Sequence, residues 1–487
     1  MGTSKRAKTW SRTFFLARVM WLLSPRQQLS NPGSSGPTCE RANANQRAEF
    51  KSAVAGGANR PEPSDPVQPI EITAMLYSRL PLMALAAALA ASPGVDAAEW
   101  VAEPSVRLDG KYNDNIRLTQ LDHNSVWGTV LDPRLKLSRR SELWDVNASG
   151  RLLASRYTGE DGMNAVDSFL DIAAKRRLER GSWDISASQV NDSTLRDEIL
   201  DPDIGLTTVQ VDRTNRSLRI AGQYLFAEDT WLLASIDYNT ASYDQGEYFG
   251  LTDYDYLTPS LRVVHQLDPQ LQLFGILSHS QTDYDTFSNQ TSKTDNLQLG
   301  AAYDITETWK ISGSVGNRRT TTSDTVANAV IRPGFEDLYP LVYDLVYLPR
   351  DRESTGLVYD TSLTHKLETG SLNLSGTRSV TPSSTGTDTD STRVAFLGTR
   401  NLNAKLYARL AVSYHQSSAV GGTTTRANNR QYRITPGLTW RLDEYLALNA
   451  GYAYTQVKRS VDGSNNADSN AVFVGIEYTW PQISVSR

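Results

Sequence analysis

Few side chains of this sequence are suited to nucleophilic or acid–base chemistry. Its histidines are His123, His265, His279, His365 and His415. His415 and Ser417 are two residues apart, so they share one face if this segment is a strand, and such a pair could act as base and nucleophile. A catalytic triad also needs a group that orients the base, and the flanking residues match no hydrolase motif. We therefore predict that the protein is not an enzyme.

Signatures of cofactor, metal and nucleic-acid sites are also missing. Cys39 is the single cysteine, and the sequence has no glycine-rich phosphate loop and no spaced set of metal ligands. Two acidic, tyrosine-rich segments, 243–248 and 253–256, contain oxygen atoms that suit calcium and rings that suit sugars. Neither has a defined ligand spacing, which favours the alternative of a solvated rim. We expect no cofactor, no bound metal and no nucleic-acid partner.

A clear pattern is found among basic residues that alternate with apolar neighbours. In the segment 405–414, Lys405 and Arg409 fall on one face of a strand, and the other face is apolar. Strands of a membrane barrel alternate in this way between the lumen and the lipid. The predicted pore-lining residues are Arg134, Lys136, Arg151, Lys175, Arg177, Arg219, Arg262, Lys310, Lys405, Arg409 and Arg433.

The charges on this face determine which solutes a pore would attract. Basic residues on a low-dielectric wall favour small anions or acidic sugars. Acidic residues alternate onto the same face, and they could neutralise the field by pairing with the basic ones. They are Asp132, Asp145, Asp167, Asp171, Asp184 and Asp360. The sequence leaves both alternatives open.

The elements that would hold these residues follow a regular rhythm. Alternating runs of roughly ten to fifteen residues are joined in turn by tight connections and by longer polar ones, which is typical of outer-membrane barrels. The tight connections contain the Gly, Asp, Asn and Pro that hairpins require. The predicted fold is all-β, a single transmembrane antiparallel barrel of about 18 strands with short periplasmic turns and longer extracellular loops. Because this number is even, both termini are expected in the periplasm.

The longest predicted loop, 322–352, is unusually apolar for a solvated connection. We expect it to fold over or into the mouth of the barrel as a constriction, and packing outside the pore is the alternative. The residues assigned to this constriction are Arg332, Phe335, Glu336, Asp337, Tyr339, Tyr343 and Asp344.

The last strand, 471–480, is expected to close the barrel. It alternates between an apolar set, which includes Val472 and Ile476, and a set of mostly small or polar side chains. Such a strand would aggregate if its edge stayed open, so it must pair, and the first strand is the partner available. An 18-stranded barrel leaves an aqueous channel inside.

Tryptophans recur beside the predicted short turns, which predicts a girdle at one membrane interface. They are Trp144, Trp183, Trp231, Trp309, Trp440 and Trp480.

Three places do not fit the alternation of apolar and polar side chains. Asp114 and Asp237 fall near the lipid face, and Phe274 with Ile276 makes one strand apolar on both faces. Bulges or rim positions are expected there.

The N-terminal region differs from the rest of the 487 residues. Residues 75–97 combine a short basic start, an apolar run and a small-residue cleavage site ending at Ala97, which predicts a Sec signal peptide. Residues 1–74 are predicted to be a mis-annotated extension upstream of a true start at Met75, or else a disordered extension. The outer-membrane barrel would then comprise residues 98–487.

Two segments resemble a known family. The opening Tyr112-Asn113-Asp114-Asn115 and the closing Tyr478-Thr479-Trp480-Pro481 are similar to outer-membrane β-barrel porins (β-barrel porin-2) encoded near exopolysaccharide or PEP-CTERM sorting genes. The closing segment also resembles the aromatic C-terminal signal of bacterial outer-membrane barrels, although residues 481–487 follow it here. The resemblance implies an outer-membrane barrel of a Gram-negative bacterium with a role in export of surface polysaccharide.

Function and partners are expected to follow from this location. We expect contact with outer-membrane lipid and lipopolysaccharide, and insertion by the barrel assembly machinery. The expected function is a porin-like channel for polysaccharide, small anions or sugars. The alternative is a non-conducting structural or surface-binding barrel.

Overall fold

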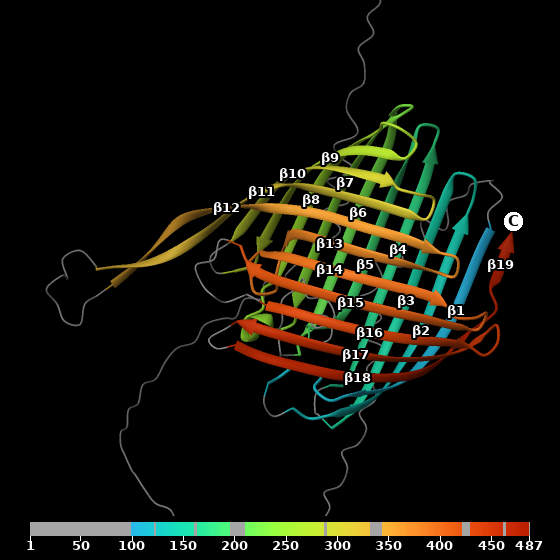
Figure 1. Cartoon of the computed structure of the whole chain (residues 1–487). Helices are drawn as coiled ribbons and strands as arrows, with labels where there is room; N and C mark the ends of the chain where they lie inside the picture. Colours follow the sequence, from blue (N-terminus) through green and yellow to red (C-terminus); the bar gives the residue numbers. More distant parts are fainter. Residues whose placement is uncertain are drawn as a thin grey trace, which may run out of the picture. The chain divides into compact units, whose positions relative to one another are not determined.

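The first and last long strands pair with each other and close the sheet. The computed structural model describes residues 99–120, 123–159, 163–194, 210–286, 290–331, 343–420, 429–460 and 464–486. In it, β1 (Glu99–Asn113) pairs with β18 (Ser464–Thr479) from Ser105↔Thr479 to Asn113↔Ala471. Each remaining strand pairs with its neighbours in chain order (Figure 1). The predicted fold, a closed antiparallel barrel of 18 strands, is confirmed.

A short strand extends the seam. β19 (Ile483–Ser486) follows the interruption at Pro481 and pairs with β1 from Glu99↔Ser486 to Ala102↔Ile483. It therefore continues β18 along the same neighbour and adds no further strand to the circumference. The chain enters the barrel at Glu99 and leaves it beside the same end of β1.

The strands between β1 and β18 are long enough to cross a bilayer at a tilt. They are β2 (Val126–Arg140), β3 (Trp144–Thr158), β4 (Ala165–Leu178), β5 (Gly181–Ser193), β6 (Asp212–Ala227), β7 (Thr230–Tyr243), β8 (Tyr254–Gln266), β9 (Leu271–Tyr284), β10 (Thr291–Asp304), β11 (Trp309–Ile331), β12 (Tyr343–Leu367), β13 (Gly370–Thr381), β14 (Thr389–Asn401), β15 (Leu406–Ala419), β16 (Asn429–Arg441) and β17 (Leu446–Ser460).

Short and long connections alternate along the chain and lie at opposite ends of the barrel. We call these the short-turn end, which contains for example residues 141–143 and 179–180, and the loop end, which contains 244–253 and 382–388. One loop contains a 3-10 helix, η2 (Gly246–Phe249). No helix among the described residues is both long and apolar enough to span a membrane.

Apolar side chains form the outer surface. Leu299 on β10 and Val315 on β11 are 69% and 56% exposed and are directly paired, so they stand together on the outside. A water-soluble protein would bury such a belt, whereas lipid accepts it. The belt is the property that makes this barrel a transmembrane one.

Most of the predicted tryptophan girdle is found at the short-turn end of this outer face. Trp144 contacts Trp183 edge-on at 5.2 Å, Trp309 stacks on His365, and Trp440 and Trp480 are exposed. Trp231 is an exception, and the prediction was wrong for it. It pairs with Val264, which is buried on the inner face, and the strand before it has a register shift between Leu225 and Ala227.

The three irregular places have different explanations. Asp114 lies beyond the end of β1 and accepts hydrogen bonds from Asn470, so it is a rim residue as expected. Asp237 faces inward, where it pairs with Arg219, and needs no bulge. Phe274 also stays in regular register; it faces inward and is covered by an arginine, as described below.

Candidate functional site: the inner wall and an inward-folded hairpin

The inner face of the barrel is polar because side chains alternate along each strand. On β2, Leu131 and Leu135 are exposed on the outside, whereas Asp132 is 2% exposed on the inside. Directly paired residues lie on the same face, so the strand register carries this assignment around the barrel. All the predicted pore-lining residues except Lys405 alternate onto the inner face. Lys405 lies in the turn before β15, where its Nζ donates to the carbonyl oxygen of Leu442.

On part of the wall the inward basic residues pair with aspartates. Asp132 on β2 accepts hydrogen bonds from Nε of Arg151 at 2.8 Å and from Nε of Arg134 at 3.0 Å. Further pairs are Arg177 with Asp145 (2.7 Å), Arg219 with Asp237 (3.0 Å) and Lys310 with Asp304 (2.6 Å). Water reaches most of these side chains, so each pair stabilises the fold only weakly. Their main effect is to neutralise charge along this part of the wall.

The wall formed by β15, β16 and β17 has the opposite character. These three strands contain no aspartate and no glutamate. Arg409 and Arg433 alternate to the inside, and within the described part of the chain neither forms an ion pair. Without a carboxylate partner, their positive charge remains directed at the lumen. We call these strands the basic wall.

Arg262 on β8 is another inward arginine without a carboxylate partner in the described ranges. Its guanidinium carbon lies 3.8 Å from the centre of the Phe274 ring, a cation–π contact. The ring of Phe274 also lies over Gly300 of β10, where a side chain would clash with it. This contact accounts for the apolar residues on the inner face of β9.

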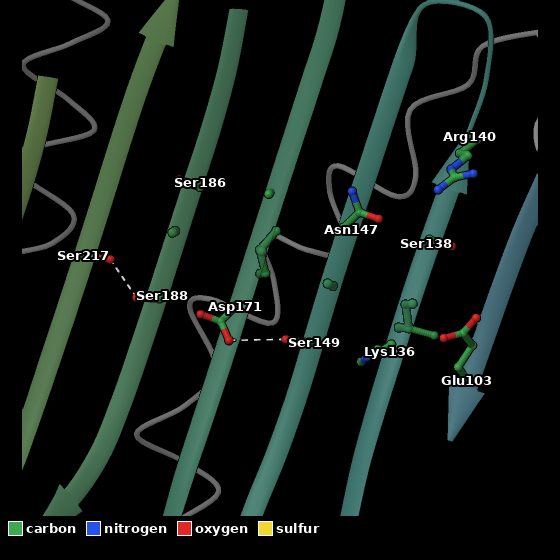
Figure 2. A pocket seen from close by; sticks show the side chains of 15 residues that line it. Glu103, Lys136, Ser138, Arg140, Asn147, Ser149, Asp171, Ser186, Ser188 and Ser217 are labelled. Atoms are coloured by element: carbon green, nitrogen blue, oxygen red, sulfur yellow. Dashed lines mark hydrogen bonds between the residues drawn. The ribbon is translucent and has the colours of Figure 1, made fainter. Parts of the chain in front are cut away.

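A polar cavity of about 550 Å³ lies along the inner face of β1 to β6. Figure 2 shows that hydroxyl, amide and charged side chains from successive strands line it. The hydroxyl of Ser149 donates to Asp171 at 3.3 Å, and the hydroxyls of Ser188 and Ser217 are 2.7 Å apart. Lys136 contributes a charge on the side of β2. The cavity is suited to polar solutes and water.

The lumen is narrowed by the end of the β13–β14 hairpin, residues 378–390, which we call the inner hairpin. Pairing of β12 with β13 stops at Tyr359↔Arg378, whereas β13 and β14 stay paired up to Thr381↔Thr389. The segment is thus freed from β12, although β14 stays paired with β15 up to Thr389↔Ala419, and it reaches the inner face of β9 and β10. There Tyr284 Oη donates to Asp388 Oδ1 at 2.7 Å, and Ser292 Oγ donates to Oδ2 at 2.6 Å.

Backbone contacts support this docking. Gln290 Nε2 donates to the carbonyl oxygen of Gly386 at 2.8 Å, and the Thr252 amide donates to the carbonyl oxygen of Ser384 at 2.8 Å. Gly386 has a φ of 74°, in the left-handed region where glycine carries no steric cost. The tip is therefore held by side chains and backbone from three neighbouring strand ends.

A charged cluster lies between the inner hairpin and the barrel wall. Arg318 of β11 crosses Gly356 of β12 and donates to Asp390 Oδ2 at 2.8 Å, while Arg378 donates to both oxygens of Asp390, each at 3.0 Å. A Cβ atom at position 356 would lie 3.1 Å from the Arg318 guanidinium. The absence of a side chain on Gly356 thus lets Arg318 lie flat and reach the hairpin.

The other side of the inner hairpin faces strands β5 to β8. Thr381 and Pro382 line a cavity of about 300 Å³ together with inward residues that include Ser188 and Tyr256. The hairpin end therefore extends across the interior between two parts of the wall. This arrangement constricts the lumen near the loop end.

Asp388 is nearly inaccessible in this arrangement. Burial raises the pKa of its carboxyl group above the ordinary value, and the hydrogen bonds from Ser292 and Tyr284 oppose the rise only in part. Arg318 is the cation whose field acts on it. The docked hairpin therefore retains the Asp388 proton to a higher pH than a solvated hairpin would.

The bounds of the loop predicted for residues 322–352 need correction. Residues 322–331 and 343–352 are strand, paired from Thr322↔Arg352 to Ile331↔Tyr343, and Figure 1 shows this β11–β12 hairpin extending beyond its neighbours. Tyr343 and Asp344 begin β12. The other residues assigned to the constriction, Arg332, Phe335, Glu336, Asp337 and Tyr339, lie outside the described residues. The β-branched residues of 322–331 were a signal for a strand.

The remaining candidate residues do not form a recognisable reactive site. His415 and Ser417 are both buried on the inner face of β15, opposite Gln431 and Asn429. In the acidic, tyrosine-rich segments, Asp253 Oδ1 accepts the backbone amide of Tyr243. Over the described ranges, no group of three or more His, Cys, Asp or Glu side chains could hold a metal ion.

Comparison with known proteins assigns no family to the chain. No protein-family model matches the chain, and no curated protein sequence matches it. The solved structures similar to it include OpdK of Pseudomonas aeruginosa, 12% identical over 78% of this chain and 99% of that one, with a TM-score of 0.37. OccAB2 of Acinetobacter baumannii is 12% identical over 78% and 98%, with a TM-score of 0.39. The ferric-catecholate import receptor Fiu of E. coli K12 is 8% identical over 77% and 81%, with a TM-score of 0.41.

Proposed function

We propose that this protein is a porin-like channel of the Gram-negative outer membrane that passes small polar solutes and prefers anions to cations. The observation that carries the proposal is the inner surface of the barrel. Eighteen strands enclose enough space for water, and the wall around that space presents ion pairs, hydroxyls and amides together with the uncompensated arginines of the basic wall.

The orientation follows from the two kinds of connection. Outer-membrane barrels direct short turns to the periplasm and long loops to the outside. In this orientation the start of β1 and the end of β19 face the periplasm. The inner hairpin lies toward the cell exterior. The apolar belt contacts lipid and lipopolysaccharide, and the barrel assembly machinery inserts the chain.

Selectivity arises from the asymmetry between the two parts of the wall. The aspartates that pair with Arg134, Arg151, Arg177 and Arg219 neutralise much of the field there. The basic wall has no such compensation, so its charge attracts anions into the passage. Dissolved salt screens exposed charges over about 10 Å at 0.1 M, so the preference should fall as the salt concentration rises.

The experiment is a reversal-potential measurement in planar bilayers across a potassium chloride gradient. We expect anion preference in the native protein and a reduced or inverted preference in the double variant Arg409→Glu with Arg433→Glu. The matched control is Arg430→Glu with Lys458→Glu, because these residues are paired on the outer face of β16 and β17, two strands of the same basic wall. Cation preference in the native protein, or equal effects of the two double variants, would contradict the proposal.

A second candidate function is a non-conducting barrel that presents its loops at the cell surface. The docked inner hairpin favours it, because it occupies part of the lumen. Export of a surface polysaccharide, which the family resemblance implies, would require the hairpin to leave the lumen. Absence of any conductance, both in the native protein and after deletion of residues 382–388, would support the non-conducting barrel.

A further inference from the structure

The cavity between the inner hairpin and strands β5 to β8 has an unusual composition for this lumen. Ser188, Ser217, Asn239 and Tyr256 form one row of directly paired inward residues across four strands. Thr381 and Pro382 of the inner hairpin cover the row from the opposite side. Two surfaces therefore enclose a space of about 300 Å³, which is at the lower end of the roughly 300–1,000 Å³ typical of ligand pockets.

Two amide groups in this cavity have no hydrogen-bond partner among the residues that the structure describes. The side chains of Asn215 and Asn239 form no hydrogen bond with any described residue, although both alternate to the inner face. Each amide offers two donors and one acceptor, which is the combination that neighbouring hydroxyl groups of a ligand require. Ser188 and Ser217 bond to each other and can redirect their hydroxyls toward a ligand.

The cavity also presents an aromatic ring, and no charged residue on the inner face lines it. Tyr256 is half-buried, and its hydroxyl makes a long, 3.4 Å contact with Ser280, which leaves the ring against the cavity. No carboxylate lines the cavity. Arg216 contributes from a position whose side chain alternates to the outer face. An ionic ligand would therefore find no counter-charge within the cavity itself.

We propose that this cavity is a binding site for one ring of a neutral sugar, a proposal that rests on the channel function and names its substrate class. The amides of Asn215 and Asn239 bind adjacent sugar hydroxyls. The ring of Tyr256 packs against the C–H face of the sugar, and Thr381 and Pro382 close the site from the hairpin.

The sugar site continues into the larger polar cavity. Ser188 and Ser217 line both cavities. Beyond them the same register row runs through Asp171, Ser149 and Lys136, each directly paired with the next (Figure 2). A sugar released from the constriction therefore meets further hydroxyl and carboxylate groups on its way toward the short-turn end.

The test uses the full barrel in detergent and maltose as the probe. Saturation-transfer NMR measures binding without requiring an open pore, and current block in planar bilayers measures it during conduction. We expect maltose to bind and to block the current, and the double variant Asn215→Ala with Asn239→Ala to weaken both effects at least tenfold. Asn373→Ala is the matched control, since Asn373 is an inward amide that already bonds to Thr364 elsewhere on the wall.

Glucuronate and glucose separate recognition of hydroxyl groups from recognition of charge. We expect glucuronate to bind in this cavity no more tightly than glucose. Binding of glucuronate alone, or maltose binding that the double variant leaves unchanged, would overturn the proposal. Should the double variant fail to fold, Tyr256→Leu serves instead, with the same tenfold weakening expected.

The two levels of proposal fail in different ways. A conducting barrel that shows no maltose signal by NMR keeps its channel function and loses the sugar site. A barrel that binds maltose but never conducts keeps the sugar site and loses the channel function.

Discussion

Replacing Asp388 by alanine should release the inner hairpin from the barrel wall. The change removes the hydrogen bonds that the Asp388 carboxyl group accepts from Tyr284 and Ser292, which are two of the contacts that hold the tip, and leaves these hydroxyls buried without their acceptor. Each lost bond costs about 1 kcal/mol, and an unsatisfied buried group costs about 1–3 kcal/mol. The carboxyl group is itself costly to bury, so we expect a net loss of docking free energy of about 2–4 kcal/mol.

This loss corresponds to a shift of roughly 30- to 700-fold in the docking equilibrium. The readout is single-channel conductance together with the size limit for neutral solutes in liposome swelling, and both should increase in Asp388→Ala. Hydrogen exchange of the amides between 382 and 388 should accelerate in parallel. The matched control is Asp283→Ala, because Asp283 precedes Tyr284 in β9 and faces outward.

Docking of the inner hairpin should also depend on pH and should weaken as the pH rises. The pKa of Asp388 is raised in the docked state, so protonation favours docking. Docking is therefore strongest below the ordinary carboxyl pKa and weakens as the pH rises through the raised value. Conductance should increase with pH in this range, and Asp388→Asn should abolish the dependence.

Unchanged conductance and exchange in Asp388→Ala would refute the reasoning that Asp388 holds the hairpin in place.

Two further substitutions test neighbouring contacts. Gly356→Leu should displace Arg318 from the inner face of β12 and weaken its bond to the hairpin. Conductance should therefore increase. A conductance equal to that of the native protein would show that Arg318 is not needed for docking. Asp132→Ala should leave Arg134 and Arg151 without their shared carboxylate. Because both arginines are about one-third exposed, we expect only about 1 kcal/mol of lost stability in urea denaturation, together with a stronger anion preference in reversal-potential measurements.

The fold could be predicted because barrel strands obey a local rule. Alternation of apolar and polar side chains, tight-turn residues and the spacing of connections are all visible within about fifteen residues. The closing contact could also be foreseen, since only the first strand was available to pair with the last. Trp231 was placed on the wrong face because it follows a short turn, as the other girdle tryptophans do, whereas the regular alternation of β7 puts it on the same inward face as Asp237.

The sequence predicted which face of each strand lines the lumen, but it did not predict which side chains on that face pair with one another. The sequence indicated that Arg134 and Arg151 face inward, but it could not show that Asp132 pairs with both. The inner hairpin was missed because residues 382–390 resemble any other polar loop. Its docking depends on Tyr284, Ser292 and Arg318, which are distant in sequence and approach it only once the barrel is formed.

The seam between β1 and β18 has a consequence for folding. Every other long strand pairs with its successor in the chain, so those hairpins can form soon after both strands exist. The pair Ser105↔Thr479 instead closes a loop that contains almost the whole barrel. The entropy of closing a loop grows only with the logarithm of its length, but the search for the correct register slows as contacts become less local. Closure of the seam is therefore expected to be the slowest pairing step, and until it occurs the curved sheet retains two apolar, unpaired edges.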